Sequence, residues 1–125
     1  MVGLNLTHQV RMGSAHGRVC ATFGTPAGDA MAELLEFYTT FHVAEEETED
    51  GPVHDPCAVL AVTHPHLFGM ASRPVRVEVD GTHTRGMTVV DERGPRAEVS
   101  FNCDVAYEAD AEALIDLVMQ SVREA

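Results

Sequence analysis

Residues 53–65 read VHDPCAVLAVTHP, and this stretch does most to decide the fold. It predicts a helix, because Asp55 is a good N-cap, Pro56 suits the first helical position and Pro65 ends the segment. The residues between the two prolines are nearly all apolar. A helix that is apolar on every side is normally enclosed by other elements, so we expect this one to be buried on most of its sides.

Two further helices flank this stretch in sequence. Thr25 and Pro26 are typical of an N-cap and a first helical residue, and the apolar residues that follow recur at helical spacing. They predict a helix over residues 26–44, followed by a solvated loop at residues 45–52, which read EEETEDGP. The chain ends with another amphipathic helix, for which Asp110 is the expected cap.

Strands are expected in the second half of the chain. Valines alternate with charged residues over 75–79, residues 87–90 form a second short segment, and apolar residues alternate with polar ones over 99–103. Turn residues separate the three segments. The order of these segments favours antiparallel neighbours. Near the N-terminus, residues 2–6 are compatible with a short buried strand, and Ser14 is a candidate cap for a short helical piece.

Composition and charge exclude several classes of protein. The 125 residues suit one domain, and 45% of them are hydrophobic, which is typical of a globular chain. There are 20 acidic residues against 8 arginines and no lysine, so the formal net charge of -12 disfavours nucleic acid as a partner. No apolar run approaches the roughly 18 residues that span a membrane, and the N-terminus lacks the basic segment of a signal peptide. We therefore expect a cytoplasmic protein without membrane contact.

His54 and Asp55 form the densest cluster of chemically versatile side chains. A carboxylate at a helix start can bind a hard cation, and an imidazole titrates near neutrality. An ordinary helix start explains the same two residues without any function. Cys57 is either a nucleophile or a core residue, and its apolar surroundings favour the core. The three cysteines lack a C-x-x-C spacing and the seven histidines are scattered, so a zinc site has little support.

Three segments resemble the inosine-uridine-preferring nucleoside hydrolases, and the resemblance as a whole covers essentially the entire chain. They are VGLNLTH at residues 2–8, PVHDPCAV at residues 52–59 and TRGMTVVD at residues 84–91. The resemblance implies an α/β fold in which residues 1–125 are a single partial domain. This would be the C-terminal part of a three-layer α/β/α domain with a mixed sheet that includes an antiparallel strand region.

The resemblance also implies an activity and a separate role for each of two residues. The family hydrolyses the N-glycosidic bond of ribonucleosides with the help of a bound calcium ion. His54 matches the histidine that protonates the departing base, and Asp55 matches a carboxylate ligand of calcium, and both roles suit these side chains. Tyr38 and His42 lie on the expected helix that borders the base pocket, which makes them candidate substrate contacts.

One departure from the family pattern limits these expectations. The family places a D-x-D-x-x-x-D-D cluster near its N-terminus, which supplies most calcium ligands and activates water, and no such cluster occurs in this sequence. Asp55 alone cannot satisfy an ion that takes about six to eight oxygens. We therefore expect weak or no calcium binding and little hydrolysis by this chain alone. The alternative is a non-catalytic interaction or oligomerisation module, and exposed apolar faces favour a homo-oligomer under either hypothesis.

Overall fold

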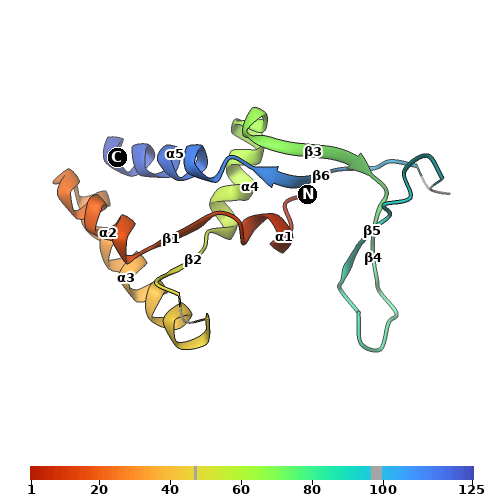
Figure 1. The fold of residues 1–125 in the computed structure, drawn as a ribbon, viewed down its shortest axis with the longest axis horizontal. Coiled ribbons are helices and arrows are strands. Elements are labelled where there is room, and N and C mark those ends of the chain that lie inside the picture. The colour runs from red at the N-terminus through yellow and green to blue at the C-terminus, as the bar shows by residue number, and fades with distance from the viewer. Residues whose placement is uncertain (47, 97–99) are drawn as a thin grey trace.

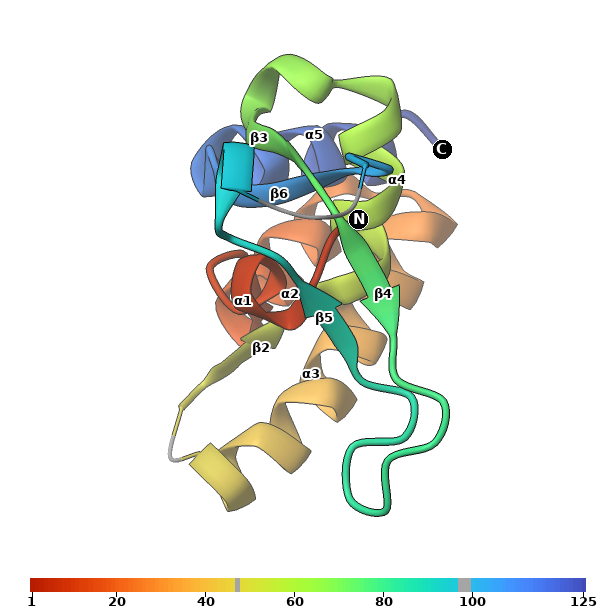
Figure 2. The same ribbon diagram turned by 90° about the vertical axis from the view of Figure 1, so that its right-hand side faces the viewer.

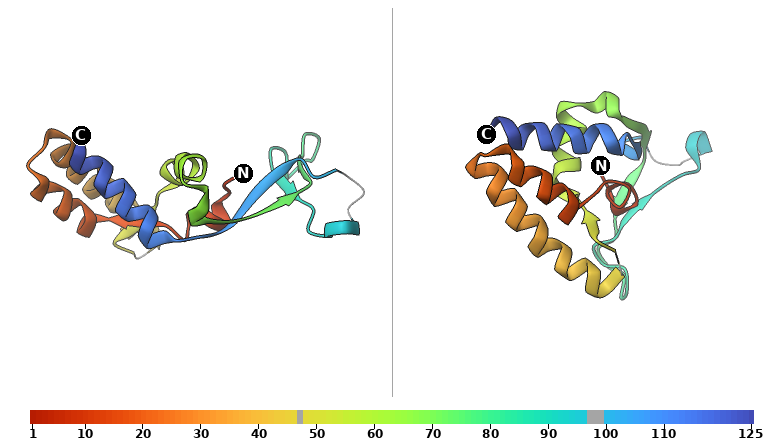
Figure 3. Two further views of the ribbon diagram at one scale, coloured as in Figure 1. Left: turned by 90° about the horizontal axis from the view of Figure 1, so that it is seen from above. Right: turned by 60° about the vertical axis from the view of Figure 1, so that its left-hand side comes forward.

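The computed structural model describes residues 1–46, 48–96 and 100–125, except for the side chains of residues 41–46 and 95. Helices α2, α3 and α5 gather at one end of an elongated molecule, and a two-stranded ribbon leads away from them to a projecting hairpin (Figures 1 and 3). The helices are α1 (Leu4–Thr7), α2 (Ser14–Cys20), α3 (Pro26–Glu46), α4 (His54–Thr63) and α5 (Ala111–Glu124), with short 3-10 turns at Ala21–Phe23, Pro65–Leu67 and Gly94–Arg96. The strands are β1 (Arg11–Gly13), β2 (Asp50–Pro52), β3 (Phe68–Arg73), β4 (Val75–Val77), β5 (Thr88–Val90) and β6 (Cys103–Ala109).

The named strands pair in antiparallel couples, β1 with β2, β3 with β6 and β4 with β5. The β3–β6 ribbon is the longest, and the β4–β5 hairpin projects below it (Figure 2). Val2 adds a single parallel bridge to Ala106 of β6, so strand contacts of both directions meet on β6. Helices packed with strands of mixed direction make this an α/β fold, as the sequence predicted.

Local capping chemistry sets the starts of the two long helices. The Gly28 amide donates to Thr25 Oγ1 at the start of α3 (3.0 Å), and the Ala113 amide donates to Asp110 Oδ1 at the start of α5 (3.1 Å). Each bond satisfies one of the amides that a helix leaves free in its first turn. Both predicted helices and both predicted caps are therefore confirmed. Among the described residues, no helix is long and apolar enough to cross a membrane.

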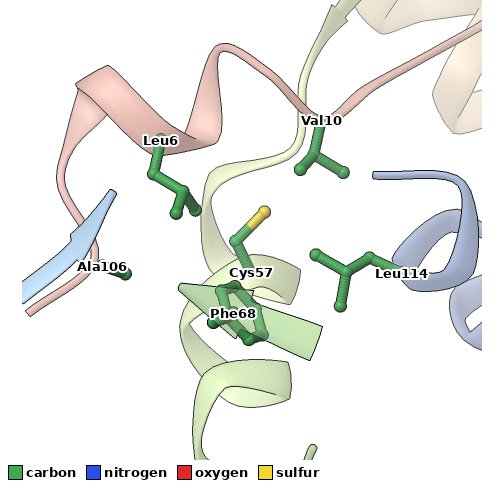
Figure 4. Packing of buried hydrophobic residues seen from close by; sticks show 6 residues of the cluster. All are labelled: Leu6, Val10, Cys57, Phe68, Ala106 and Leu114. Carbon is green, nitrogen blue, oxygen red and sulfur yellow. The ribbon is translucent and has the colours of Figure 1, made fainter. Parts of the chain in front are cut away.

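The hydrophobic core lies where α1, α4, α5, β3 and β6 meet. Its side chains point toward one another from these elements and from the loop after α1 (Figure 4). They are Leu6, Val10, Cys57, Phe68, Ala106 and Leu114. Cys57 is the fourth residue of α4 and packs in this core. The core therefore fixes the start of that helix against α1 and α5.

The predicted strand at residues 2–6 is wrong. The amides of Leu6 and Thr7 both donate to the Gly3 carbonyl (3.0 and 3.1 Å), which closes a helical turn. Only Val2 keeps an extended contact, because the chain turns into α1 directly after Gly3. The N-terminal segment is also joined to β6 by hydrogen bonds, since the Ala106 amide donates to the Met1 carbonyl (3.0 Å) and Gln9 Nε2 donates to the Tyr107 carbonyl (3.1 Å). It enters the core through Leu6.

Two predictions about α4 are also wrong. The helix begins at His54 with Val53 in the cap position, so Asp55 belongs to the first turn and is not the cap. The helix is not buried on most sides, because Val59 and Val62 are 62% and 81% exposed. Within the described part of the chain, the face of α4 that carries Cys57 packs against the core and the face that carries Val59 and Val62 is open. The apolar sequence of the helix could not reveal this difference.

Three boundaries differ from the sequence prediction. α3 continues into the expected acidic loop, and Asp50–Pro52 at the end of that loop form β2, because β1 provides a partner strand. The last strand begins at Cys103, and it pairs with β3, which was not predicted; Val99, the predicted start, lies outside the described residues. Ser14 is the first residue of α2, and Gly13 holds the cap position.

Candidate functional site

Backbone pairing places the start of α4 beside the segment that follows α1. The Val53 amide donates to the Val10 carbonyl (3.0 Å), which extends the contact between the two chain segments to the residue before His54. Arg11 Nε donates to Asp50 Oδ1 (2.8 Å) and fastens β1 to β2 just upstream. The fold therefore holds His54 on the side of α4 that faces α1.

The His54 side chain contacts two residues of the N-terminal segment. Its Nδ1 lies 2.8 Å from the Thr7 hydroxyl oxygen. Its ring centroid lies 5.8 Å from that of His8, with the ring planes tilted by 52°. Thr7 is 3% exposed, whereas His54 is only partly buried. The imidazole is thus anchored through one nitrogen and keeps some access to solvent.

Asp55 is exposed in the first turn of α4, where the helix dipole favours a negative charge. It lines a groove of about 570 Å³ between α3, α4 and α5. The apolar part of the lining includes Met31, Leu34, Val59 and Leu117. The structure keeps His54 and Asp55 next to each other but gives them different surroundings, since His54 meets α1 and Asp55 borders the groove.

The residues that the structure describes do not fit a calcium ion on this chain alone. Among them there is no group of three or more histidine, cysteine, aspartate or glutamate side chains placed to hold a metal. Calcium takes about six to eight oxygen ligands, and one exposed carboxylate falls far short of that number. The described residues therefore do not form a complete calcium site around Asp55.

Tyr38 and His42, the two predicted substrate contacts, lie on α3. The Tyr38 hydroxyl donates to the Pro52 carbonyl (2.8 Å), and this bond ties α3 to the strand that leads into α4. The side chain of His42 lies outside the described residues. Tyr38 thus has a definite structural contact two residues before His54, and its contact with substrate stays a prediction.

The remaining candidates do not add to the site. Cys57 is completely buried in the core, and burial raises the pKa of its thiol, which disfavours the reactive thiolate. The prediction of a core cysteine is confirmed. His64 and His66 lie beyond the far end of α4 with their ring centroids 6.0 Å apart, well separated in sequence from the His54 turn.

Sequence reasoning missed Thr7 and His8 as neighbours of His54. The Thr7 contact joins residues 47 positions apart, and no local pattern links such distant positions. The available signal was the resemblance itself, because both residues belong to the VGLNLTH segment that carries it. Segments that share a family resemblance are candidates for contact around a common site.

Comparison with solved structures gives the class of protein, the ribonucleoside hydrolases. A purine-preferring ribonucleoside hydrolase from Gardnerella vaginalis superposes with a TM-score of 0.85 and 25% sequence identity, over 99% of this chain and 39% of its own. A plant nucleoside hydrolase superposes with a TM-score of 0.83 over 98% of this chain and 40% of its own. The latter is 23% identical, so it shows the fold alone.

Sequence comparison identifies the family. The profile of the inosine-uridine preferring nucleoside hydrolases matches residues 1–116. A pyrimidine-specific ribonucleoside hydrolase from Klebsiella pneumoniae is 37% identical over 96% of this chain and 39% of its own length. An inosine-uridine preferring nucleoside hydrolase from Leishmania major is 40% identical over 98% of this chain and 38% of its own length. The chain belongs to this family, as its three segments predicted, and it spans about two-fifths of the length of these relatives.

Proposed function

We propose that this chain supplies the leaving-base side of a ribonucleoside hydrolase pocket. In that reaction water replaces the base at C1′ of the ribose, and the electrons of the broken N-glycosidic bond remain on the base. A proton donor near the base lowers the cost of this charge, and His54 is the proposed donor. The observation that carries the proposal is the anchoring of a partly exposed His54 ring by Thr7 in a chain of this family.

Asp55 and Tyr38 have secondary parts in this proposal. Asp55 contributes one carboxylate toward a metal site, and calcium is the ion that the resemblance implies. Since the described residues do not form that site by themselves, we propose that the isolated chain binds calcium weakly or not at all and hydrolyses little nucleoside. Tyr38 and His42 are proposed substrate contacts on α3, and residues 1–125 are proposed to be one partial domain.

A chimeric enzyme tests the role of His54. The segment of the Klebsiella pneumoniae relative that aligns with this chain is replaced by residues 1–125, and ribose release from uridine is measured. His54→Ala should lower kcat about 100- to 10,000-fold, the usual contribution of a general acid. His66→Ala, at an exposed histidine beyond the other end of α4, is the matched control and should leave kcat unchanged. A folded chimera that keeps its rate after His54→Ala contradicts the proposal.

A second candidate function is a non-catalytic module that assembles with copies of itself. The exposed apolar side chains beside the groove, Val59 and Val62 on α4 and Leu34 on α3, favour it. We propose that two copies associate through this face, because joining two such faces removes apolar surface from water on both.

Light scattering over a hundredfold range of concentration tests this assembly. Val62→Glu should shift the chain toward the monomer by placing a charge at the interface. Val79→Glu is the matched control, since Val79 is an exposed valine of the hairpin region. A wild-type chain that stays monomeric throughout the range, or equal effects of the two variants, contradicts the proposed face.

A further inference from the structure

We propose that Thr7 is the positioning residue of His54, and that its hydroxyl donates a hydrogen bond to Nδ1. This bond places the ring proton of the neutral imidazole on Nε2, the nitrogen that faces away from Thr7. The inference rests on the proposed function for its catalytic meaning. The hydrogen bond itself is a property of this chain and can be tested without substrate.

The contact has the geometry of a good hydrogen bond in a protected place. The Thr7 oxygen lies 2.8 Å from His54 Nδ1, close to the usual donor–acceptor distance. Thr7 is 3% exposed and sits between Leu6, which is in the core, and His8, which is in ring contact with His54. A buried hydroxyl that lacks a partner destabilises the fold, so this hydroxyl needs the bond that His54 provides.

The backbone around Thr7 indicates which atom donates. A threonine hydroxyl in a helix commonly bonds to the carbonyl three or four residues earlier. For Thr7 these are the carbonyls of Leu4 and Gly3. The Gly3 carbonyl already accepts two amides, those of Leu6 and Thr7, and the Leu4 carbonyl accepts the His8 amide. In the described part of the chain the Thr7 hydroxyl bonds to neither of these carbonyls, and the acceptor within reach of its proton is His54 Nδ1.

Thr39 shows the ordinary arrangement in the same molecule. It is the other buried threonine among the described residues, 6% exposed, and its hydroxyl donates to the Leu35 carbonyl one turn earlier in α3 (2.7 Å). The two residues share chemistry and burial, yet only Thr7 turns its hydroxyl toward a titratable side chain.

The bond has a specific consequence for the proposed chemistry. A ring nitrogen that accepts a hydrogen bond carries no proton in the neutral imidazole, so the other nitrogen carries it. Nδ1 of the neutral ring is therefore engaged by Thr7, and Nε2–H is the group that can donate a hydrogen bond to a departing base. Transfer of a proton starts from the imidazolium, in which Nδ1 is also protonated and donates to the Thr7 oxygen while Nε2 gives its proton to the base. Fixing one nitrogen also limits rotation of the ring, and such orientation is a large part of what an enzyme contributes to proton transfer.

The test is nitrogen-15 NMR of the histidine-labelled chain at pH 9, where an ordinary imidazole is neutral. His54→Gln identifies the His54 signals. In the wild-type chain we expect one tautomer at His54, with an unprotonated, hydrogen-bonded Nδ1 and a protonated Nε2. Thr7→Val should move both shifts toward the averaged values of a free imidazole. Thr7→Ser keeps the hydroxyl and should restore the wild-type shifts.

Thr39→Val is the matched control, because it also replaces a buried threonine hydroxyl but leaves His54 untouched. A protonated Nδ1 in the wild-type chain overturns the proposal, even if Thr7→Val fails to fold. Unchanged His54 shifts in folded Thr7→Val, or the same change in Thr39→Val, also overturn it. Since no nucleoside is present, a failed chimera assay removes the catalytic role of His54, whereas a wrong tautomer removes the role of Thr7.

Discussion

Two faces of α4 differ in what covers them. On one face Cys57 is completely buried and His54 is bonded to Thr7. On the other face Val59 and Val62 are mostly exposed, although both are apolar. The contrast separates the face of the helix that this chain covers from the face that stays exposed to solvent.

The contrast shows that a helix can carry apolar side chains on a face for which its own chain provides no neighbour among the described residues. Each buried Å² of apolar surface contributes roughly 25 cal/mol, so an exposed valine gains little from its position on the helix. A helix that is apolar on every face is most stable when every face is covered. The open face of α4, next to the groove shared with α3 and α5, is therefore a surface where a further layer or a second copy would remove apolar side chains from water.

The largest expected effect comes from matched leucine substitutions on the covered and open sides. Leu6→Ala removes a completely buried side chain that packs with Cys57, and we expect a loss of about 2–5 kcal/mol in the free energy of unfolding. Leu34→Ala changes a groove residue that is 61% exposed, and we expect a change within about 0.5 kcal/mol. Urea unfolding of both variants measures the two losses.

The comparison fails if the two leucine variants lose similar stability. Self-association through the groove would make the Leu34→Ala loss depend on protein concentration, because binding stabilises the folded state by mass action. Unfolding is therefore measured at two concentrations. If Leu34→Ala loses stability only at the higher protein concentration, the loss comes from assembly of copies. The difference in burial between Leu6 and Leu34 within one chain then still holds.

A smaller effect is expected where a helix start is secured locally. α5 begins with a side-chain cap, the bond from the Ala113 amide to Asp110, whereas α4 has Val53 at the cap position and no such bond. Asp110→Ala should cost about 0.5–2 kcal/mol of unfolding free energy, and Asp110→Ser should recover most of it. Equal stabilities of Asp110→Ala and the wild-type chain in urea would show that α5, like α4, is fixed by packing.

The sequence predicted those parts of the fold that depend on near neighbours. Thr25, Pro26 and Asp110 act within one helical turn, so the starts of α3 and α5 were correctly predicted. Pairings between distant segments were not predicted. The β3 strand pairs with β6, thirty or more residues away in the chain. Residues 4–6 belong to a helix, and Val2 forms a single bridge to Ala106 of β6.

The candidate site divides in the same way. His54 and Asp55 could be named from their chemistry and from the family resemblance, because both lie in one short segment. Their surroundings could not be predicted from that segment. The groove beside Asp55 is formed by three helices, and the partner of His54 is Thr7 of α1. The degree of burial of α4 was mispredicted for a related reason, because it depends on what packs against the helix and not only on its composition.

The smallest effect on stability is expected in the hairpin region, at the carboxyl of Asp91. Asp91 accepts hydrogen bonds from the side chain and the amide of Arg93, and these lower the pKa of its carboxyl from the usual 3.8 to about 2. The folded chain therefore favours the ionised carboxylate more than the unfolded chain does. The resulting stabilisation is present above about pH 4 and is lost as the pH falls from there through about 2.

An NMR titration of the Asp91 side-chain carbon measures this midpoint, and two arginine variants identify its cause. Arg93→Gln should raise the midpoint the most, although only in part, because the amide at residue 93 still donates. Arg76→Gln should raise the midpoint less, because Arg76 acts on this carboxyl only through its charge and more weakly than Arg93 does. Equal shifts in both variants would mean that general charge, and not the local turn, holds Asp91 ionised. The hairpin would then be less ordered around Asp91 than the start of α4 is around His54.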